Sequence, residues 1–158
     1  MAHCAMYRRA LGAFAMALAA LAPTPALAQG NVPLVDLGWL VVPVYLNDAA
    51  EPLRFVLDTG ATGTSITAAT AAQFARDEGQ AIQVQGASGR APARIVTVDA
   101  LTVGGYRAPN RQVIALTEAL LEAGGETFDG ILGAEILSSF DVLIDVPNGL
   151  LQLLPRGD

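Results

Sequence analysis

The sequence predicts a mainly β domain that closes as a barrel and carries one or two short helices. Three observations support this: short apolar segments rich in β-branched residues recur along the chain, glycines and other turn residues separate them, and only two segments favour helix. We count seven or eight expected strands. The roughly 130 residues after the N-terminal segment suit one domain with a modest core.

The first 28 residues are expected to be an export signal and not part of the fold. Two adjacent arginines supply positive charge, an apolar stretch covers residues 10–22, and an Ala-Leu-Ala pattern ends at Ala28. The apolar stretch is shorter than the roughly 20 residues of a membrane-spanning helix. We therefore favour cleavage over the alternative, a retained membrane anchor. The mature domain is then residues 29–158, periplasmic or secreted, with no membrane contact after cleavage.

The N-terminal half of this domain is expected to form one hairpin, one helix and part of a second hairpin. β-branched and apolar residues on both sides of a turn favour the first hairpin, and an alanine-rich run followed by glycine favours the helix. The expected elements are strands at 39–46 and 53–57, a helix at 67–76, and strands at 82–85 and 94–103.

The C-terminal half is expected to end in a closing hairpin. Gly104-Gly105 is a hairpin signal, and Pro147-Asn148-Gly149 is the turn of the closing hairpin. Between these turns, local propensities favour a strand, a helical turn or loop, and a short helix. The expected elements are a strand at 112–116, a helical turn or loop at 117–123, a helix at 134–140, and strands at 141–146 and 150–154.

The composition of the mature chain excludes most catalytic mechanisms. The only histidine and the only cysteine lie in the export signal, and lysine is absent throughout. Nucleophilic mechanisms that need histidine, cysteine or lysine each lack a member. Zinc sites of cysteine or histidine are likewise excluded, and no cofactor is expected. Carboxylates remain as the best groups for acid–base work.

The net charge argues against a nucleic-acid partner. The mature chain has seven arginines against fifteen acidic residues, a net charge of −8, and no basic run. Such a surface repels a phosphate backbone. The acidic surface is consistent with a soluble domain that binds something other than nucleic acid.

Asp58-Thr59-Gly60 is the main candidate for chemistry. Asp58 directly follows the apolar strand expected at 53–57, so its carboxylate lies at the end of that strand. Thr59 offers a hydroxyl, and the N–H of Gly60 is free to point at the carboxylate. The alternative is an aspartate that only caps a turn.

Two glycine motifs accompany it. In Asp129-Gly130-Ile131-Leu132-Gly133, glycines flank an apolar pair, which predicts that two chain segments pass closely there. Asp129 is the one rival carboxylate and a candidate second acid. The segment Gly86-Ala87-Ser88-Gly89 lies between two expected strands and is either a flexible hairpin loop or a lid over a cleft.

Taken together, these motifs resemble the retropepsin-type aspartic proteases of the single-lobed bacterial kind. The segment Phe55-Val56-Leu57-Asp58-Thr59-Gly60-Ala61 matches the apolar-Asp-Thr-Gly-Ala signature of that family, and Gly130-Ile131-Leu132-Gly133 matches its later glycine-flanked pair. The closing hairpin is similar too, and Gly86, Ala87, Ser88 and Gly89 occupy the flap position. The resemblance spans residues 35–155 and implies a single-lobed acid-protease fold.

The resemblance implies an aspartic endopeptidase that works as a homodimer. Two Asp58 carboxylates would meet on a two-fold axis, Thr59 would clamp the partner loop, and Gly60 would orient Asp58. The substrate would be an extended peptide or protein segment beneath the flap. Two alternatives stay open: a non-catalytic peptide-binding or dimerisation domain on the same fold, and a carboxylate metal-binding protein, which the lack of a clustered ligand set disfavours.

Overall fold

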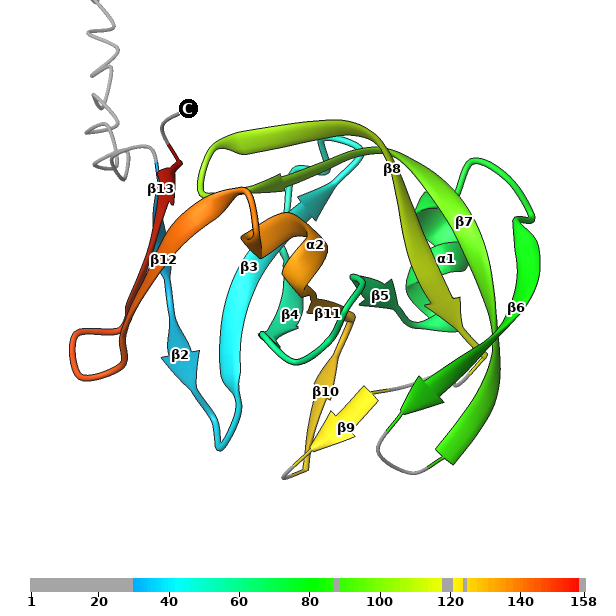
Figure 1. Ribbon diagram of the computed structural model, residues 1–158, viewed down its shortest axis with the longest axis horizontal. Coiled ribbons are helices and arrows are strands. Elements are labelled where there is room, and N and C mark those ends of the chain that lie inside the picture. The colour runs from blue at the N-terminus through cyan, green and yellow to red at the C-terminus, as the bar shows by residue number, and fades with distance from the viewer. Residues whose placement is uncertain (1–29, 87–88, 118–120, 124, 157–158) are drawn as a thin grey trace, which may run out of the picture.

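Six strands pair edge to edge and close into a ring at the centre of the fold (Figure 1). The computed structural model describes residues 30–86, 89–117, 121–123 and 125–156. A pairing between the first and last strands of the series closes the ring. In spatial order the six are β3 (Leu40–Leu46), β4 (Leu53–Leu57), β11 (Gly130–Leu132), β5 (Ser65–Ile66), β8 (Tyr106–Leu116) and β7 (Gly89–Val103). The predicted mainly β fold is confirmed, and the closed ring agrees with the predicted barrel.

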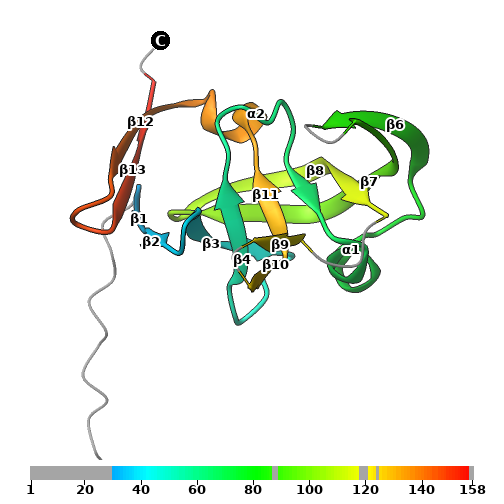
Figure 2. The ribbon, with the colours of Figure 1, turned by 90° about the horizontal axis from the view of Figure 1, so that it is seen from below.

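Shorter strands extend the ring or stand beside it. β2 (Val35–Asp36) pairs with β3, β6 (Gln80–Gly86) pairs with β7, and β9 (Leu121–Ala123) forms a hairpin with β10 (Glu126–Phe128). A separate three-stranded sheet stands at one end of the molecule (Figure 2). Its strands are β1 (Asn31–Pro33), β13 (Leu150–Pro155) and β12 (Phe140–Asp145).

The two helices are short. α1 (Ala68–Phe74) begins where predicted, because the Thr67 hydroxyl oxygen accepts the N–H of Thr70 at 3.1 Å and caps the first turn. α2 (Ala134–Leu137) follows β11 directly. The helix predicted at 134–140 is therefore too long. Phe140 instead begins β12, and its ring packs against Tyr106 with the ring centroids 4.8 Å apart.

The core fills the ring and continues under the three-stranded sheet. Phe55 and Leu132 from the ring are fully buried, as are Leu151 and Leu153 from β13. Burying a side chain of this size contributes about 1.5–3 kcal/mol. Val56 points the opposite way from Phe55 and packs in a second cluster with Val41 and Phe128. The β9–β10 hairpin therefore covers the other face of β4.

The sequence underestimates the number of strands. The described residues hold thirteen, against the seven or eight expected. Seven of them have five residues or more, while the other six have only two or three, too few to show a period of alternation. Residues 121–123 form β9 through pairing with β10, so the expected helical turn or loop is wrong there.

Within the described residues, no helix has the length and apolarity to cross a membrane. The predicted export signal, residues 1–28, lies outside the described residues.

Candidate active site

A tight turn at the end of β4 holds the Asp58 carboxylate. The backbone N–H of Asp58 donates to the Leu132 carbonyl at 3.1 Å, and the N–H of Gly60 donates to Asp58 Oδ1 at 2.8 Å. The N–H of Ala61 closes the turn on the Asp58 carbonyl at 3.3 Å. Asp58 is half-buried, although the three residues before it are buried. The carboxylate is therefore oriented by backbone and still reaches the surface.

β11 lies between β4 and β5, so the turn that joins those two strands passes over its end. β11 is parallel to β4 and antiparallel to β5. The Thr64 hydroxyl oxygen accepts the N–H of Gly133 at 3.0 Å, and the N–H of Ala134 donates to the Ala61 carbonyl at 2.8 Å. These bonds hold the middle and the far end of the Asp58 turn against the start of α2.

The close approach at Gly133 requires a glycine. A Cβ at this position would lie 2.5 Å from the Gly63 carbonyl carbon, closer than real Cβ atoms come. Gly130 is equally confined, since its Cβ would lie 2.5 Å from the Ser65 carbonyl oxygen. The predicted close passage of two segments at this motif is confirmed.

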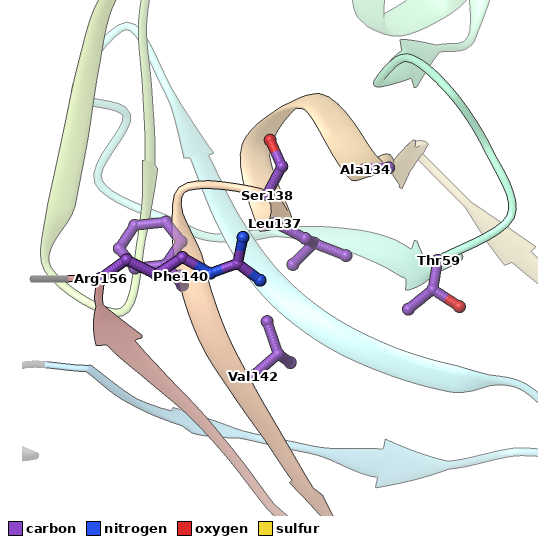
Figure 3. A pocket seen from close by; sticks show the side chains of 7 residues that line it. All are labelled: Thr59, Ala134, Leu137, Ser138, Phe140, Val142 and Arg156. Atoms are coloured by element: carbon purple, nitrogen blue, oxygen red, sulfur yellow. The ribbon is translucent and has the colours of Figure 1, made fainter. Parts of the chain in front are cut away.

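Thr59 lies beside Asp58 on the exposed side of the turn. Its side chain lines a groove with α2 at one wall and the β12–β13 hairpin at the other (Figure 3). Among the described residues the Thr59 hydroxyl makes no hydrogen bond. The remaining residues of the groove are Ala134, Leu137, Ser138, Phe140, Val142 and Arg156.

The sequence matches the profile of the aspartyl protease family over residues 42–136, which is more than half of the chain. The chain belongs to the aspartyl protease family. The matched segment includes the Asp58 turn and the Gly130–Gly133 motif. No curated protein matches the sequence.

Two solved structures are similar to this chain, and the first of them shows the same fold. A retropepsin-like aspartic protease from Rickettsia conorii has a TM-score of 0.58 and 20% sequence identity to this chain, and the match covers 78% of this chain and 87% of that one. The EIAV protease, solved in complex with the inhibitor HBY-793, has a TM-score of 0.49 and 20% identity over 66% of this chain and 90% of its own. The fold of this member of the family is retropepsin-like.

Asp129, the rival carboxylate, lies at the other end of β4. Its carboxylate Oδ2 accepts the N–H of Arg54 at 2.7 Å, and its own N–H donates to the Arg54 carbonyl at 2.9 Å. Asp58 is four residues further along, about 13 Å away at roughly 3.3 Å per residue. Asp129 therefore does not pair with Asp58 within one chain. Asp129 instead joins β10 to β4, as Glu126 does through its 2.8 Å ion pair with Arg54.

The candidate flap is the end of the β6–β7 hairpin. Gly86 and Gly89 lie opposite each other in the register, and Ala87 and Ser88 of the candidate flap lie outside the described residues. Gly89 has φ of 116°, a conformation that favours glycine. This end of the hairpin and the turn between β4 and β5 lie on the same side of the ring (Figure 2).

Two further residues of the site lacked a sequence signal. Thr64 is 1% exposed, and its role depends on Gly133, which is 69 positions away. Glu135 has a buried carboxylate oxygen, Oε2, without a hydrogen-bond partner in the described residues, close against Gly133.

The part of the chain that the structure describes holds no group of three or more histidine, cysteine, aspartate or glutamate residues that could bind a metal ion. The interpretation as a carboxylate metal-binding protein therefore finds no ligand set there.

Proposed function

We propose that the protein is an aspartic endopeptidase whose active site is formed by two Asp58 carboxylates, one from each chain of a homodimer. The observation that supports this most directly is the Asp58 turn itself. It presents one carboxylate, held at 2.8 Å by the Gly60 N–H, at the surface of an aspartyl protease fold.

Peptide hydrolysis by carboxylates needs two of them. One carboxylate accepts a proton from the attacking water, while the other, protonated, donates to the carbonyl oxygen of the scissile bond. Two such carboxyl groups at close range share one proton, because like charges at short distance do not both ionise easily. Each chain supplies a single Asp58, and Asp129 sits about 13 Å along the strand, so the second group comes from a second chain.

The neighbouring residues have supporting roles in this mechanism. Gly60 orients the carboxylate through its backbone N–H. Thr59, which is exposed beside Asp58, reaches across to the partner's turn with its hydroxyl. Gly86, Ala87, Ser88 and Gly89 form a flap over an extended peptide substrate, whose backbone pairs with strand edges. The mechanism needs no cofactor.

The proposed setting is outside the cytoplasm. Residues 1–28 have the charge and apolar pattern of an export signal, and the domain 29–158 has no cysteine, so it needs no oxidative folding there. N-terminal sequencing of the protein recovered from the periplasm or medium tests this. A mature chain that begins near residue 29 supports export with cleavage, and an intact, membrane-bound N-terminus indicates a retained anchor.

The test of the function is a peptide-library digest by residues 29–158 across acidic to neutral pH, with Asp58→Asn as the comparison. Asparagine keeps the shape of the side chain but cannot shuttle the proton, so we expect cleavage to disappear while circular dichroism and thermal unfolding stay the same. Specific activity should also rise with protein concentration, as a shared site requires.

Three outcomes decide between the alternatives. Full activity in refolded Asp58→Asn would rule out the proposed site. Cleavage by a monomer at high dilution would rule out the shared site. A dimer that binds peptides and cleaves none would instead support a non-catalytic peptide-binding or dimerisation domain.

A further inference from the structure

A second cavity lies beside α2, apart from the groove that Thr59 lines. Its volume is about 230 Å³, and it is formed by the end of the β7–β8 hairpin, α2 and the start of β12 (Figure 1). Ile136 of α2 lines this cavity, whereas the next residue, Leu137, lines the groove with Thr59. Neither Asp58 nor Thr59 borders the second cavity. It is therefore a separate feature from the candidate active site.

Most of the wall of this cavity is apolar. Leu101 and Val103 of β7 are fully buried, and Ile136 and Phe140 are buried. The Tyr106 ring packs at a tilt against Phe140, which fixes the aromatic part of the wall. Such a wall suits the apolar body of a ligand.

Arg111 brings a positive charge to the same cavity. It lies opposite Val98 in the β7–β8 register, and residues directly opposite each other point to the same face of a sheet. Val98 is fully buried, so the Arg111 side chain leaves β8 on the face towards the core. Arg111 is half-buried there. Its stem therefore lies among apolar residues and its guanidinium reaches the cavity.

Arg111 differs from most arginines of the domain because it has no anionic partner. Residues 29–158 hold seven arginines and fifteen acidic residues. Among the described residues, four arginines form ion pairs with carboxylates, and Arg94 donates to two backbone carbonyls. In the same part of the chain, only Arg111 and the exposed Arg90 do neither. A half-buried arginine without a carboxylate, in so acidic a domain, can pair with an anion from outside.

The other arginine at the cavity, Arg107, already has its partner. Its Nη2 lies 2.8 Å from Asp48 Oδ2, and its Nε donates to Asp48 Oδ1 at 3.0 Å. Arg111 therefore has to supply the charge that holds an anion here. The domain as a whole has a net charge of −8, which repels anions at long range. An anion without an apolar body therefore gains little from this cavity.

We propose that this cavity binds a small organic carboxylate with an apolar body. The carboxylate pairs with Arg111, and the apolar body contacts Leu101, Ile136 and Phe140. A guanidinium and a carboxylate form strong, charge-assisted hydrogen bonds with matching geometry. An apolar cavity with one well-placed charged group is typical of small-molecule sites. The site is additional to the proposed endopeptidase and does not depend on it.

The experiment is isothermal titration calorimetry of the protein with octanoate as the probe. Octanol has the same apolar chain without the charge, and acetate has the charge without the chain. Arg111→Gln removes the cation, and Arg90→Gln is the matched control, because Arg90 is exposed on β7 and does not line the cavity. Ala108→Leu fills the cavity, since Ala108 lines it opposite Leu101 in the register. Thermal melts establish that each variant is folded.

We expect saturable binding of octanoate, weaker binding of octanol and no binding of acetate. Arg111→Gln should raise the octanoate dissociation constant at least about tenfold, the range expected for hydrogen bonds to a charged group, and leave octanol binding unchanged. Ala108→Leu should abolish the binding of both. Arg90→Gln and Asp58→Asn should bind octanoate as the wild type does.

Three results would overturn the site. The first is a wild-type protein that shows no saturable binding of octanoate. The second is equal affinity for octanoate and octanol, because the cation would then contribute nothing. The third is a loss in Arg90→Gln as large as that in Arg111→Gln. If Arg111→Gln fails to fold, Ala108→Leu and the comparison of octanoate with octanol still decide. None of these results bears on peptide cleavage, so the two proposals fail independently.

Discussion

The Thr64 hydroxyl oxygen accepts the backbone N–H of Gly133 at 3.0 Å, although the two residues are 69 positions apart in the chain. This bond joins the far end of the Asp58 turn to the start of α2. Both residues are buried, so water does not replace either partner. The geometry of the candidate active site therefore depends on a contact that spans half of the domain.

Replacing Thr64 with valine tests this contact. Valine has nearly the same shape but accepts no hydrogen bond, so the buried Gly133 N–H loses its partner. We expect a loss of about 1–3 kcal/mol in the free energy of unfolding, measured by urea denaturation. Thr64→Ser keeps the acceptor and is the control. Equal stability of the valine and serine variants would show that the bond contributes nothing.

Gly133→Ala should disturb the Asp58 turn through the backbone. The new Cβ would lie 2.5 Å from the Gly63 carbonyl carbon, and only a shift of the main chain relieves this contact. We expect destabilisation of about 1–3 kcal/mol together with reduced peptide cleavage. Gly86→Ala is the stability control, because among the described residues its Cβ would meet only the Gly89 carbonyl oxygen, at 3.8 Å. Thermal melts of both variants give the comparison, and an unchanged Gly133→Ala melt would contradict the close packing.

Asp129→Asn should leave cleavage intact. Its carboxylate oxygen accepts the Arg54 N–H, and an asparagine carbonyl oxygen can accept the same bond. We expect kcat/KM within about threefold of the wild type, in contrast to the loss in Asp58→Asn. Steady-state assays on a peptide substrate check this. If Asp129→Asn lost as much kcat/KM as Asp58→Asn does, Asp129 would have to take part in the reaction.

Thr59 should act through its hydroxyl and across the dimer. Because the hydroxyl makes no hydrogen bond among the described residues, Thr59→Val should leave the stability of the monomer within about 0.5 kcal/mol of the wild type. In the dimer we expect weaker association and lower activity on dilution. Thr59→Ser keeps the hydroxyl and should preserve both. The idea fails if valine and serine variants dissociate alike.

Asp48 should stabilise the fold in a pH-dependent way. The hydrogen bonds from Arg107 hold the pKa of the Asp48 carboxyl below its ordinary value of 3.8. A lowered pKa means that the contribution is present above about pH 3.8 and is lost as the pH falls through the lower, folded-state pKa. Asp48→Asn should therefore lower Tm slightly near neutral pH and have no effect in strong acid.

Asparagine is the suitable replacement for Asp48 because it removes the charge without straining the backbone. Asp48 has φ of 59°, a left-handed conformation that asparagine tolerates well. Both side chains of the ion pair are exposed, so salt should reduce the difference near neutral pH. A Tm difference that grows in acid would contradict the sign.

Local sequence predicted that the longer elements exist, but the two longest strands, β7 and β8, begin five and six residues before the predicted starts at 94 and 112. β4 has the bounds expected from its apolar run, and Thr67 caps α1 where the alanine-rich segment begins. The elements that were missed are those with two or three residues, such as β5 and β9. Their strand conformation comes from pairing with distant segments and not from local propensity, so no periodic pattern marks them.

By itself, the sequence determined the available chemistry and the motif that carries it. Residues 29–158 contain no histidine, cysteine or lysine, which leaves the carboxylates, and Asp58, at the end of an apolar strand, is the best placed of them. Only the tertiary structure decided how the pieces meet. In the fold, the Asp129 carboxylate accepts the N–H of Arg54, and the Thr64 hydroxyl accepts the N–H of Gly133. The groove that Thr59 lines extends to the β12–β13 hairpin. The physical reason is that closing the ring buries residues that are far apart in the chain against one another. A local sequence pattern does not contain these long-range contacts.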